Sequence, residues 1–415
     1  MKWEKVRLGK FITPKKGFAF KSSKYVASGV PIVRVSNFTN DSISNDDLKY
    51  YPLEEKVNFG EFELCEKDVI IQTVGSWQNN PASVVGKVVR VPYYLDGALL
   101  NQNAVKLIPK NSIDNNYLFY RLKTDAFKGH VLGEARGAAN QASITLDTIK
   151  SFEFLIPDKK KQIKIGNILS TYDELIENNQ KQVKLLEEAA QRLYKEWFVD
   201  LRFPGYENTP IIDGVPEGWN HIYLENVISK ITTGLNPRKN FVLGNGNNYY
   251  VTIKNMRNNN VYLDEKCDRI DDEAIIKINK RSNLQIGDIL FSGIGTMGRV
   301  YLVNIPTNNW NVSESVFTLR ANNKISKELL YLILLSDNVQ KYCDQHAHGV
   351  AQRGIRMADL KAYKFVLPSK NIIENFTKII KPIINKIQNL NVQIVDATKA
   401  RDRLLTKLMS GEIEV

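Results

Sequence analysis

The chain has 415 residues, of which 43% are hydrophobic and 25% are charged, and its formal net charge is +12. This length exceeds what one core ordinarily serves, so we expect two domains of average size with connecting elements. The three cysteines lie far apart, which excludes a disulfide framework and favours a reducing cytoplasm. The surplus of Lys and Arg favours a polyanionic partner, most commonly nucleic acid, although the same charge could serve solubility alone.

Neither a signal peptide nor a membrane span is expected. The opening MKWEKVRLGKF contains no apolar run of the kind that a signal peptide needs. The longest apolar stretch, LLYLILL at residues 329–335, is far too short to cross a bilayer. The sequence therefore predicts a cytoplasmic protein.

Residues 1–157 alternate short β-rich runs with turn residues. Val, Ile, Tyr and Phe bounded by Gly, Asn and Pro are typical of short strands. The runs are PIVRVSNF, DVIIQTV, VVGKVVRVP and NAVKLIP. With one helix expected around residues 116–126, this segment predicts an irregular α+β domain.

A long helix is expected over residues 158–200. Between residues 160 and 197 there is no proline and one glycine, and apolar positions recur at helical spacing. These positions are Ile168, Tyr172, Leu175, Val183, Leu186, Ala190, Leu193 and Trp197. The spacing around Asn179 indicates a stutter in a heptad pattern.

Residues 201–218 are rich in Pro and Gly, which marks a linker and a domain boundary. Beyond the linker, residues 219–368 return to short β-rich runs. These runs are YYVTIKNM, DILFSG, RVYLVN and ESVFTLR, with a helix expected around residues 326–343. The sequence predicts a second domain of the same kind as the first.

A second long helix is expected over residues 369–415, where apolar positions alternate steps of four and three. They are Phe376, Ile380, Ile383, Ile387, Leu390, Ile394, Ala397, Arg401, Leu404 and Leu408. Pro382 lies inside the pattern, so we expect a kink or a later start there. The simplest partner for this seam is the first long helix. The predicted core of the pair is Leu175, Val183, Leu186, Ala190, Leu193, Ile387, Leu390, Ile394, Ala397 and Leu404.

Four blocks recur in both halves in the same order. Trp3 and Trp219 open the two copies, KDVIIQTVG matches GDILFSGIG, and NNYLFYRLKTDAF matches KELLYLILLSDNV. GAANQASITLDTIKSFEFLIP then matches GVAQRGIRMADLKAYKFVLP. An internal duplication explains this order. The predicted fold class is α+β, with two similar globular α/β domains in a pseudo-two-fold arrangement, separated by a long antiparallel helix pair, a coiled coil.

Two similar domains held apart by helices could meet one DNA duplex at two sites, as dimeric DNA readers do. Because the copies differ strongly in their loops, the two half-sites should differ in sequence. A reader of an asymmetric, interrupted DNA site is therefore expected.

The repeated blocks and the long helix after each copy resemble the specificity subunit of Type I restriction–modification systems over essentially the whole chain. The resemblance implies that each domain is a target recognition domain for one half of a bipartite site. It also implies that the helices set the spacing and dock two methyltransferase subunits, and through them restriction–translocase subunits. S-adenosylmethionine, Mg²⁺ and ATP would be used by those partners and not bound by this chain. The alternatives are a self-contained DNA methyltransferase or nuclease, and a coiled-coil adaptor without a DNA role.

Base contacts need paired donors and acceptors, such as Arg for guanine and Asn or Gln for adenine, projecting from loops. Two loops in each domain qualify, at residues 75–80 and 136–141 in the first and at residues 293–299 and 346–356 in the second. The candidates are Ser76, Trp77, Gln78, Asn79, Arg136, Asn140, Gln141, Thr296, Arg299, His348, Gln352, Arg353 and Arg356. The alternative is an ordinary polar turn, and Trp77 is either a wedge against a base or a partly buried anchor of its loop.

Phosphate contacts are expected from Lys and Arg that are otherwise solvated charge. The candidates are Lys15, Lys16, Lys21, Lys24, Arg238, Lys239 and Lys254.

Two further motifs suggest chemistry but carry little weight. Residues 293–298 spell G-x-G-x-x-G, but a strand-like run follows where a nucleotide loop needs a helix, so a tight hairpin is expected. Cys343, His346 and His348 give three potential metal ligands without a fourth nearby, so no metal site is expected. No D/N-P-P-F/Y tetrapeptide of an amino-methyltransferase occurs, and no catalytic residue is predicted.

Overall fold

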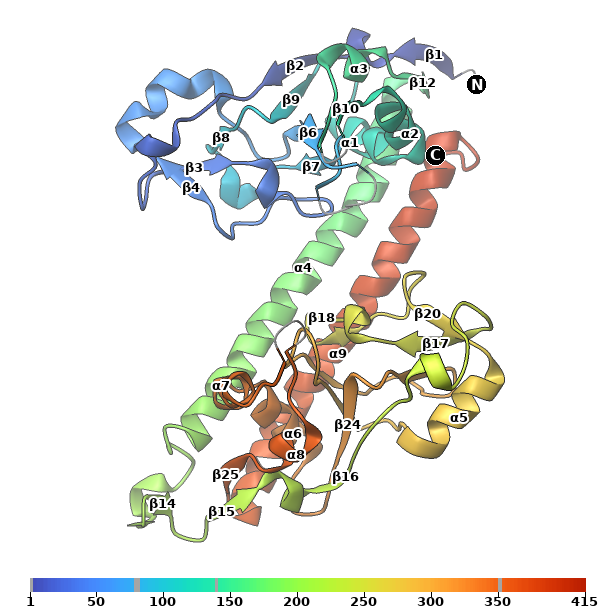
Figure 1. Cartoon of the computed structure of the whole chain (residues 1–415). Helices are drawn as coiled ribbons and strands as arrows, with labels where there is room; N and C mark the ends of the chain where they lie inside the picture. The colour runs from blue at the N-terminus through green and yellow to red at the C-terminus, as the bar shows by residue number, and fades with distance from the viewer. Residues whose placement is uncertain (1–2, 78–82, 139–140, 350–352) are drawn as a thin grey trace. The chain divides into compact units, whose positions relative to one another are not determined.

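The computed structural model describes residues 3–77, 83–138, 141–349 and 353–415. The chain forms two compact units, shown with the element labels in Figure 1. Unit 1 comprises Met1–Glu177 and Val395–Val415, and unit 2 comprises Asn178–Ile394. Each unit thus includes a part of both long helices, a division that the five predicted segments did not anticipate.

Unit 1 is built on a four-stranded antiparallel sheet in the order β2-β9-β5-β7. These strands are β2 (Ile12–Lys16), β9 (Ala104–Pro109), β5 (Val69–Gln72) and β7 (Val88–Arg90). A second sheet has the order β4-β3-β8, from β4 (Lys49–Tyr51), β3 (Val30–Val33) and β8 (Leu99–Leu100). The remaining strands are β1 (Glu4–Arg7) with β12 (Glu153–Ile156), and β10 (Arg136–Ala138), β11 (Gln141–Ser143) and β6 (Val74–Gly75). The short helices are α1 (Asn115–Lys123), α2 (Asp125–Glu134) and α3 (Leu146–Ser151).

Unit 2 has a four-stranded antiparallel sheet in the order β16-β24-β21-β22. These strands are β16 (Ile228–Thr233), β24 (Val316–Ala321), β21 (Ile289–Ser292) and β22 (Val300–Leu302). The second sheet has the order β20-β17-β23, from β20 (Asp268–Ile270), β17 (Asn248–Val251) and β23 (Trp310–Val312). Three two-stranded pairs are β15 (Asn220–Tyr223) with β25 (Lys364–Leu367), β18 (Met256–Arg257) with β19 (Asn260–Val261), and β13 (Ile211–Ile212) with β14 (Val215–Pro216). The short helices are α5 (Asp272–Ser282), α6 (Lys327–Leu335), α7 (Asp337–Gln345) and α8 (Met357–Lys361).

The two units repeat one topology, which confirms the duplication. The order β2-β9-β5-β7 corresponds strand by strand to β16-β24-β21-β22. In the second sheet, β3 is antiparallel to β4 and parallel to β8, and β17 is likewise antiparallel to β20 and parallel to β23. Even the turn after the central strand matches: in the 3₁₀ helices at Val35–Asn37 and Ile253–Asn255, the last Asn accepts a hydrogen bond through Oδ1 from the backbone amide three residues before it, at 3.0 and 2.9 Å.

Helix α5 was not predicted, although its ends carry ordinary signals. The Asp271 side chain accepts a hydrogen bond from Ala274 N and caps the N-terminus, and Asn283 ends the helix in the left-handed conformation. The predicted helix around residues 326–343 is two helices. Ser336 separates them with an extended backbone, and its hydroxyl caps α7.

The long helices are α4 (Lys159–Phe198) and α9 (Lys370–Ser410). Helix α9 continues through Pro382, so the expected later start is wrong, and Pro382 lies on the exposed side of the helix. The ring leaves the carbonyl of Lys378 without its intrahelical partner, a loss that an exposed face tolerates because water can replace the bond.

The predicted stutter in α4 is also wrong. Leu175, expected in the core, is 44% exposed, whereas Ile176 and Asn179 are buried. With these two positions, and with Tyr172 and Leu186 half-buried, steps of three and four alternate from Gln162 to Ala190, and the buried face then continues to Trp197. Its residues are Gln162, Ile165, Leu169, Ile176, Asn179, Val183, Ala190, Tyr194 and Trp197. The predicted stutter is therefore a polar residue, Asn179, inside a continuous seam.

Within unit 2, α4 packs on α9 through a small apolar cluster. Val183, Ile387 and Leu390 are buried there, and Leu186 and Ile394 pack against them. Asn179 Nδ2 donates to Gln393 Oε1 at 3.2 Å beside this cluster. The main core of unit 2 includes Ala190 and Trp197, with Leu193 packed against it.

Within unit 1, both helices contribute to the main core. Ile165 and Leu169 from α4 and Leu408 from α9 are buried in it, and Leu404 packs against it. Ala397 is also buried. Each unit is therefore completed by residues from both long helices.

Candidate nucleic-acid interface

In unit 1, the two predicted loops come together through strand pairing. β11 pairs with β6 in the register Ala142 with Gly75 and Ser143 with Val74, and β10 completes this small sheet. The indole N–H of Trp77 donates to the carbonyl of Ala138 at 3.0 Å, which ties the first loop to the second. Loops that lie some 60 residues apart thus form one surface.

The described candidates of unit 1 divide into exposed and anchored side chains. Arg136 and Gln141 are exposed on β10 and β11. Ser76 shares a hydrogen bond with Ser83 at 2.9 Å between their hydroxyl oxygens. Trp77 packs partly against the main core, which favours the anchor over the wedge. Gln78, Asn79 and Asn140 lie outside the described residues.

Unit 2 joins its two loops in the same way. Ile294 and His348 each form an isolated antiparallel bridge with Gly354. The amide of Gly295 donates to the carbonyl of Arg353 at 2.8 Å, and the amide of Ile355 donates to Gly293 at 2.8 Å. The two predicted loops are therefore paired with each other in both units, which the sequence did not predict.

The candidates of unit 2 are held differently. His348 Nε2 lies 3.0 Å from Asp359 Oδ2, and the Arg353 guanidinium donates to the carbonyl of Asp344 at 2.8 Å. Thr296 and Arg356 are exposed, and Arg356 occupies the N-cap position of α8. Gln352 lies outside the described residues.

Arg299 is tied to the body of unit 2. Its guanidinium turns inward and donates to the carbonyls of Ile253 and Met256 at 2.8 and 2.5 Å. Both bonds are made by Nη1, one of the three nitrogens of the guanidinium. Arg299 therefore ties the 293–298 hairpin to the turn after β17, and its base-contact role stays a prediction.

The phosphate candidates also differ in their surroundings. Lys15 and Lys24 form ion pairs with Glu61 and Glu55 at 2.7 and 2.9 Å. The hydrogen bond that Lys24 donates to Glu55 raises the pKa of Lys24 above its ordinary value. Lys24 is nevertheless exposed, as are the remaining candidates, Lys16, Lys21, Arg238, Lys239 and Lys254.

The G-x-G-x-x-G sequence forms a hairpin, as predicted. It connects β21 to β22, which pair antiparallel with Phe291 opposite Val300. Gly295 and Gly298 both have positive φ, at 80°, which explains glycine at these two positions. No helix N-terminus faces this loop from the following element, so the geometry is not that of a phosphate-binding loop.

The three potential metal ligands lie in different surroundings. Cys343 is buried, and burial raises the pKa of its thiol to about 12. His346 is exposed, and its Nδ1 lies 2.9 Å from the carbonyl of Tyr342. Within the described parts of the chain, no three His, Cys, Asp or Glu side chains are grouped as a metal would require.

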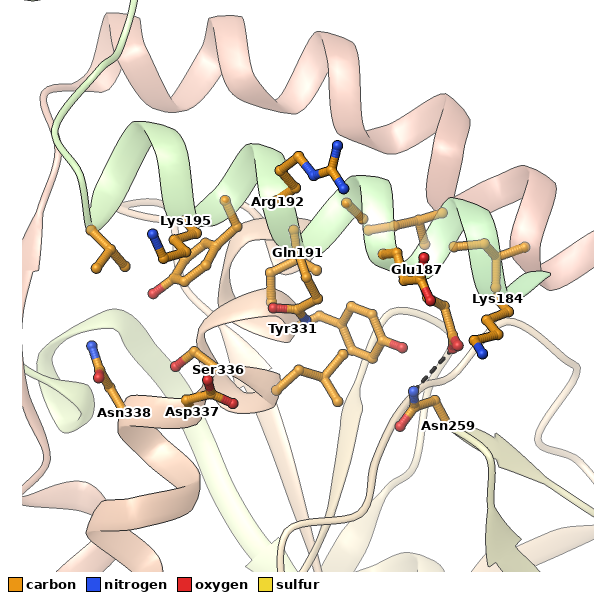
Figure 2. Close-up of a pocket in the computed structure, with 18 of the residues that line it drawn as sticks. Lys184, Glu187, Gln191, Arg192, Lys195, Asn259, Tyr331, Ser336, Asp337 and Asn338 are labelled. Atoms are coloured by element: carbon orange, nitrogen blue, oxygen red, sulfur yellow. Dashed lines mark hydrogen bonds between the residues drawn. The ribbon is translucent and has the colours of Figure 1, made fainter. Parts of the chain in front are cut away.

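A groove of about 710 Å³ lies in unit 2 between α4 and the corner that joins α6 to α7 (Figure 2). Lys184, Gln191 and Arg192 line it from α4, and Tyr331 and Asp337 line it from the other side. Asn259 Nδ2 donates to Glu187 Oε1 at 3.0 Å at one end, where burial raises the pKa of Glu187. Its mixed charges and apolar floor fit a polypeptide better than a nucleic-acid backbone.

None of the described helices is long and apolar enough to cross a membrane.

Comparisons with known proteins agree with this architecture. A family model described as the Type I restriction modification DNA specificity domain matches residues 1–188 and 216–398. The MjaIX specificity subunit of Methanocaldococcus jannaschii is 27% identical over 320 residues, which cover 76% of this chain and 73% of that protein. The EcoBI specificity subunit of Escherichia coli is 23% identical over 445 residues, which cover 99% and 86%.

The fold has a counterpart among solved structures. The S subunit of a Type I restriction–modification system from M. genitalium matches with a TM-score of 0.61 at 16% identity, covering 99% of this chain and 96% of that one. The family model matches the chain twice, once on each side of the predicted linker, and so covers both halves of the duplication. The chain therefore belongs to the family of Type I restriction–modification specificity subunits.

Proposed function

We propose that this chain is the non-catalytic subunit that reads an asymmetric, bipartite DNA site for a Type I restriction–modification enzyme, with one unit for each half-site. The observation that carries the proposal is the repeated geometry of the loops. Each unit brings two polar loops, distant in sequence, onto one surface by β-pairing. Because the two units share one topology but differ in their loops, they suit two half-sites of different sequence.

The side chains available in each unit support this reading. Unit 1 offers Arg136 and Gln141, and unit 2 offers Thr296, Arg353 and Arg356. Arg favours guanine and Gln favours adenine in the major groove, so the two units should read different bases. The net charge of +12 suits attraction to the duplex, with phosphates met by exposed Lys and Arg.

The long helices would carry the partners. We place the docking of two methyltransferase subunits on the outward faces of α4 and α9, and restriction–translocase subunits would join through them. The groove in Figure 2 is a specific candidate surface on α4. S-adenosylmethionine, Mg²⁺ and ATP would be bound by the partners, and the assembly would work in the cytoplasm.

The first test measures DNA binding as salt is raised. The full chain, co-purified with its methyltransferase subunits, should bind duplex DNA with a steep negative slope of log affinity against log salt. Salt-independent binding, or none, would favour the adaptor without a DNA role. The chain alone should neither methylate nor cut DNA, and either activity would favour the self-contained enzyme.

The second test addresses the division of labour. Residues 1–155 are exchanged for those of a relative, and methylated sites are mapped across host DNA. One half of the recognised sequence should change while the other half remains. A change in both halves, or in neither, would contradict one unit for each half-site.

The third test addresses the spacing. Lengthening α4 by one or two turns adds roughly 5 to 11 Å of helix. The mapped half-sites should keep their sequences and move further apart. An unchanged gap would contradict a spacing role for the helix.

A further inference from the structure

A buried polar side chain stands at the same place in both units. Gln72 is the last residue of β5 and Ser292 is the last residue of β21, and these are corresponding strands. KDVIIQ and GDILFS also align these two residues. Gln72 is 1% exposed and Ser292 is fully buried. Each therefore sits directly below the first loop of its unit.

Gln72 closes the base of the loop in unit 1. Its Nε2 donates to the carbonyl of Val74 at 2.9 Å and to the carbonyl of Ser83 at 3.0 Å. These carbonyls lie on the two sides of the loop that carries Ser76 and Trp77. One amide group thus fixes the distance between the arms of the loop.

Ser292 closes the base of the corresponding loop in unit 2 with a shorter side chain. Its hydroxyl donates to the carbonyl of Thr296 at 2.7 Å and accepts from the amide of Arg299 at 2.8 Å. The hairpin it closes is shorter than the loop above Gln72. The longer side chain therefore accompanies the loop with more residues, and the shorter side chain accompanies the loop with fewer.

Two features show that the contacts of Gln72 have a cost, one in stability and one in the residue that position 75 can hold. Gln72 Oε1 is buried without a hydrogen-bond partner among the described residues, which stability alone would not favour. A Cβ at Gly75 would lie 2.5 Å from Gln72 Nε2 and 2.3 Å from the carbonyl of Ser83. Glycine at this position is what lets the amide approach both arms of the loop.

We infer that Gln72 and Ser292 are positioning residues for DNA reading, each setting the shape of the loop above it and so controlling base discrimination in one half-site. They do not themselves contact DNA, because they are buried. This inference rests on the proposed function, since it names the residues through which each unit holds its reading surface.

The test uses the full chain in complex with its methyltransferase subunits. The probes are a duplex with the site mapped for the unaltered protein, and duplexes with single-base changes in either half. Gln72→Met keeps the side-chain length and removes both hydrogen bonds. Ser292→Ala removes the hydroxyl, and Ser292→Thr restores it. Thr318→Val is the matched control, because Thr318 lies opposite Leu290 in the same sheet and is equally buried, and its hydroxyl has no partner in the described structure.

Gln72→Met should lower discrimination at the half-site read by unit 1 at least about tenfold, within the range that one mismatched base pair commonly produces, and leave the other half unchanged. Ser292→Ala should do the reverse, with discrimination recovered in Ser292→Thr and unaltered in Thr318→Val. Gly75→Ala should reproduce the Gln72→Met result by displacing the amide.

Three outcomes overturn the inference. The first is unchanged discrimination in both Gln72→Met and Ser292→Ala. The second is an equal loss at both half-sites, which marks general destabilisation. The third is a loss in Thr318→Val as large as in Ser292→Ala. If the unaltered complex shows no discrimination at all, the proposed function fails and this inference fails with it.

Discussion

The two units hold the same pair of helices with different chemistry. In unit 1, α4 and α9 are joined by a network of charges, whereas in unit 2 they are joined by a small aliphatic cluster and by packed aromatic rings. Charges in a half-buried setting depend on every partner being present, because a charge left alone is costly. Rings depend on volume and shape instead. The units should therefore fail under different perturbations, although they share one topology.

The network of unit 1 centres on Arg401. Its Nη1 lies 2.7 Å from an oxygen of Asp173 on α4 and 3.2 Å from an oxygen of Asp41. Lys123 reaches the other oxygen of Asp41 at 2.6 Å, and the hydroxyl of Tyr120 donates to Asp173. A residue of α9 thus links α4, α1 and the segment before β4. Nearby, the guanidinium of Arg121 donates to the carbonyl of Met409 at 3.0 Å, which holds the end of α9.

The aromatic cluster of unit 2 centres on Phe376. This α9 residue is fully buried, with ring centroids 5.4 Å from Trp197 and 4.7 Å from Phe198, both on α4. Phe198 also approaches Trp219, whose ring centroid lies 4.7 Å from that of Phe203 in the linker. The linker is thus packed into the core of unit 2, although its Pro and Gly content indicated only a boundary.

The largest expected effect comes from emptying the ring cluster. Phe376→Ala should destabilise unit 2 by ~3–5 kcal/mol, because it removes a buried ring and leaves a cavity that the other rings cannot fill. Denaturant unfolding measures the loss, and hydrogen exchange should place it in unit 2. Ile379→Ala is the control on the same helix, since Ile379 is 47% exposed and should cost little. Equal losses in the two variants would contradict the assigned role of the cluster.

Breaking the charge network should have the next largest effect. Arg401→Met should cost about 2–4 kcal/mol, because Asp41 and Asp173 lose their shared cation in a half-buried place. The side chain of Arg401 is only 13% exposed, so water replaces little of this interaction. Hydrogen exchange should now rise in unit 1 and not in unit 2. Asp402→Ala removes the exposed partner of Arg401 and should change stability by less than about 1 kcal/mol.

Lowering the pH should destabilise unit 1 before unit 2, and this effect should be smaller than that of either substitution above. Burial alone would raise the pKa of Asp41, but the charges of Lys123 and Arg401 outweigh it and hold that pKa below its ordinary value. A lowered carboxyl pKa contributes stability above the pKa of the unfolded chain, and this is lost as pH falls through the folded value. Between about pH 5 and pH 2, exchange should therefore rise earlier around residues 395–410 than around Phe376. The Arg401→Met variant should lose most of this difference, and a difference that persists in it would point to another group.

Much of the fold could be predicted because it depends on local patterns. The strand runs, the linker and both long helices follow from composition and periodicity, and the duplication is visible as repeated text. The failures have physical causes. Asn179 looked like an interruption because a buried amide is rare in an apolar seam, and its partner Gln393 is 214 residues away. Helix α5 was missed although Asp271 and Asn283 carry the signals of its two ends.

The candidate interface was predictable as loops but not as side chains. The repeated blocks located all four loops, and β-pairing joins them in both units. The sequence could not show that Arg299 bonds carbonyls more than 40 residues away, nor that Gln72 and Ser292 lie below the loops. Such residues are recognised by their partners in space, which a single sequence does not contain.

The smallest effect tests the seam that passes through both units. Leu175 and Ile176 are neighbours on α4, but only Ile176 is buried, at 9% exposed. Leu175→Gln should therefore change the free energy of unfolding by no more than about 0.5 kcal/mol, since the side chain already meets water. Ile176→Ala should cost roughly 2 kcal/mol or more, because it removes buried methyl groups. Denaturant midpoints of the two variants, measured side by side, decide the register. A larger loss in Leu175→Gln would mean that Leu175 occupies the buried position instead of Ile176, as the predicted stutter requires. The burial of Asn179 would then be unexplained.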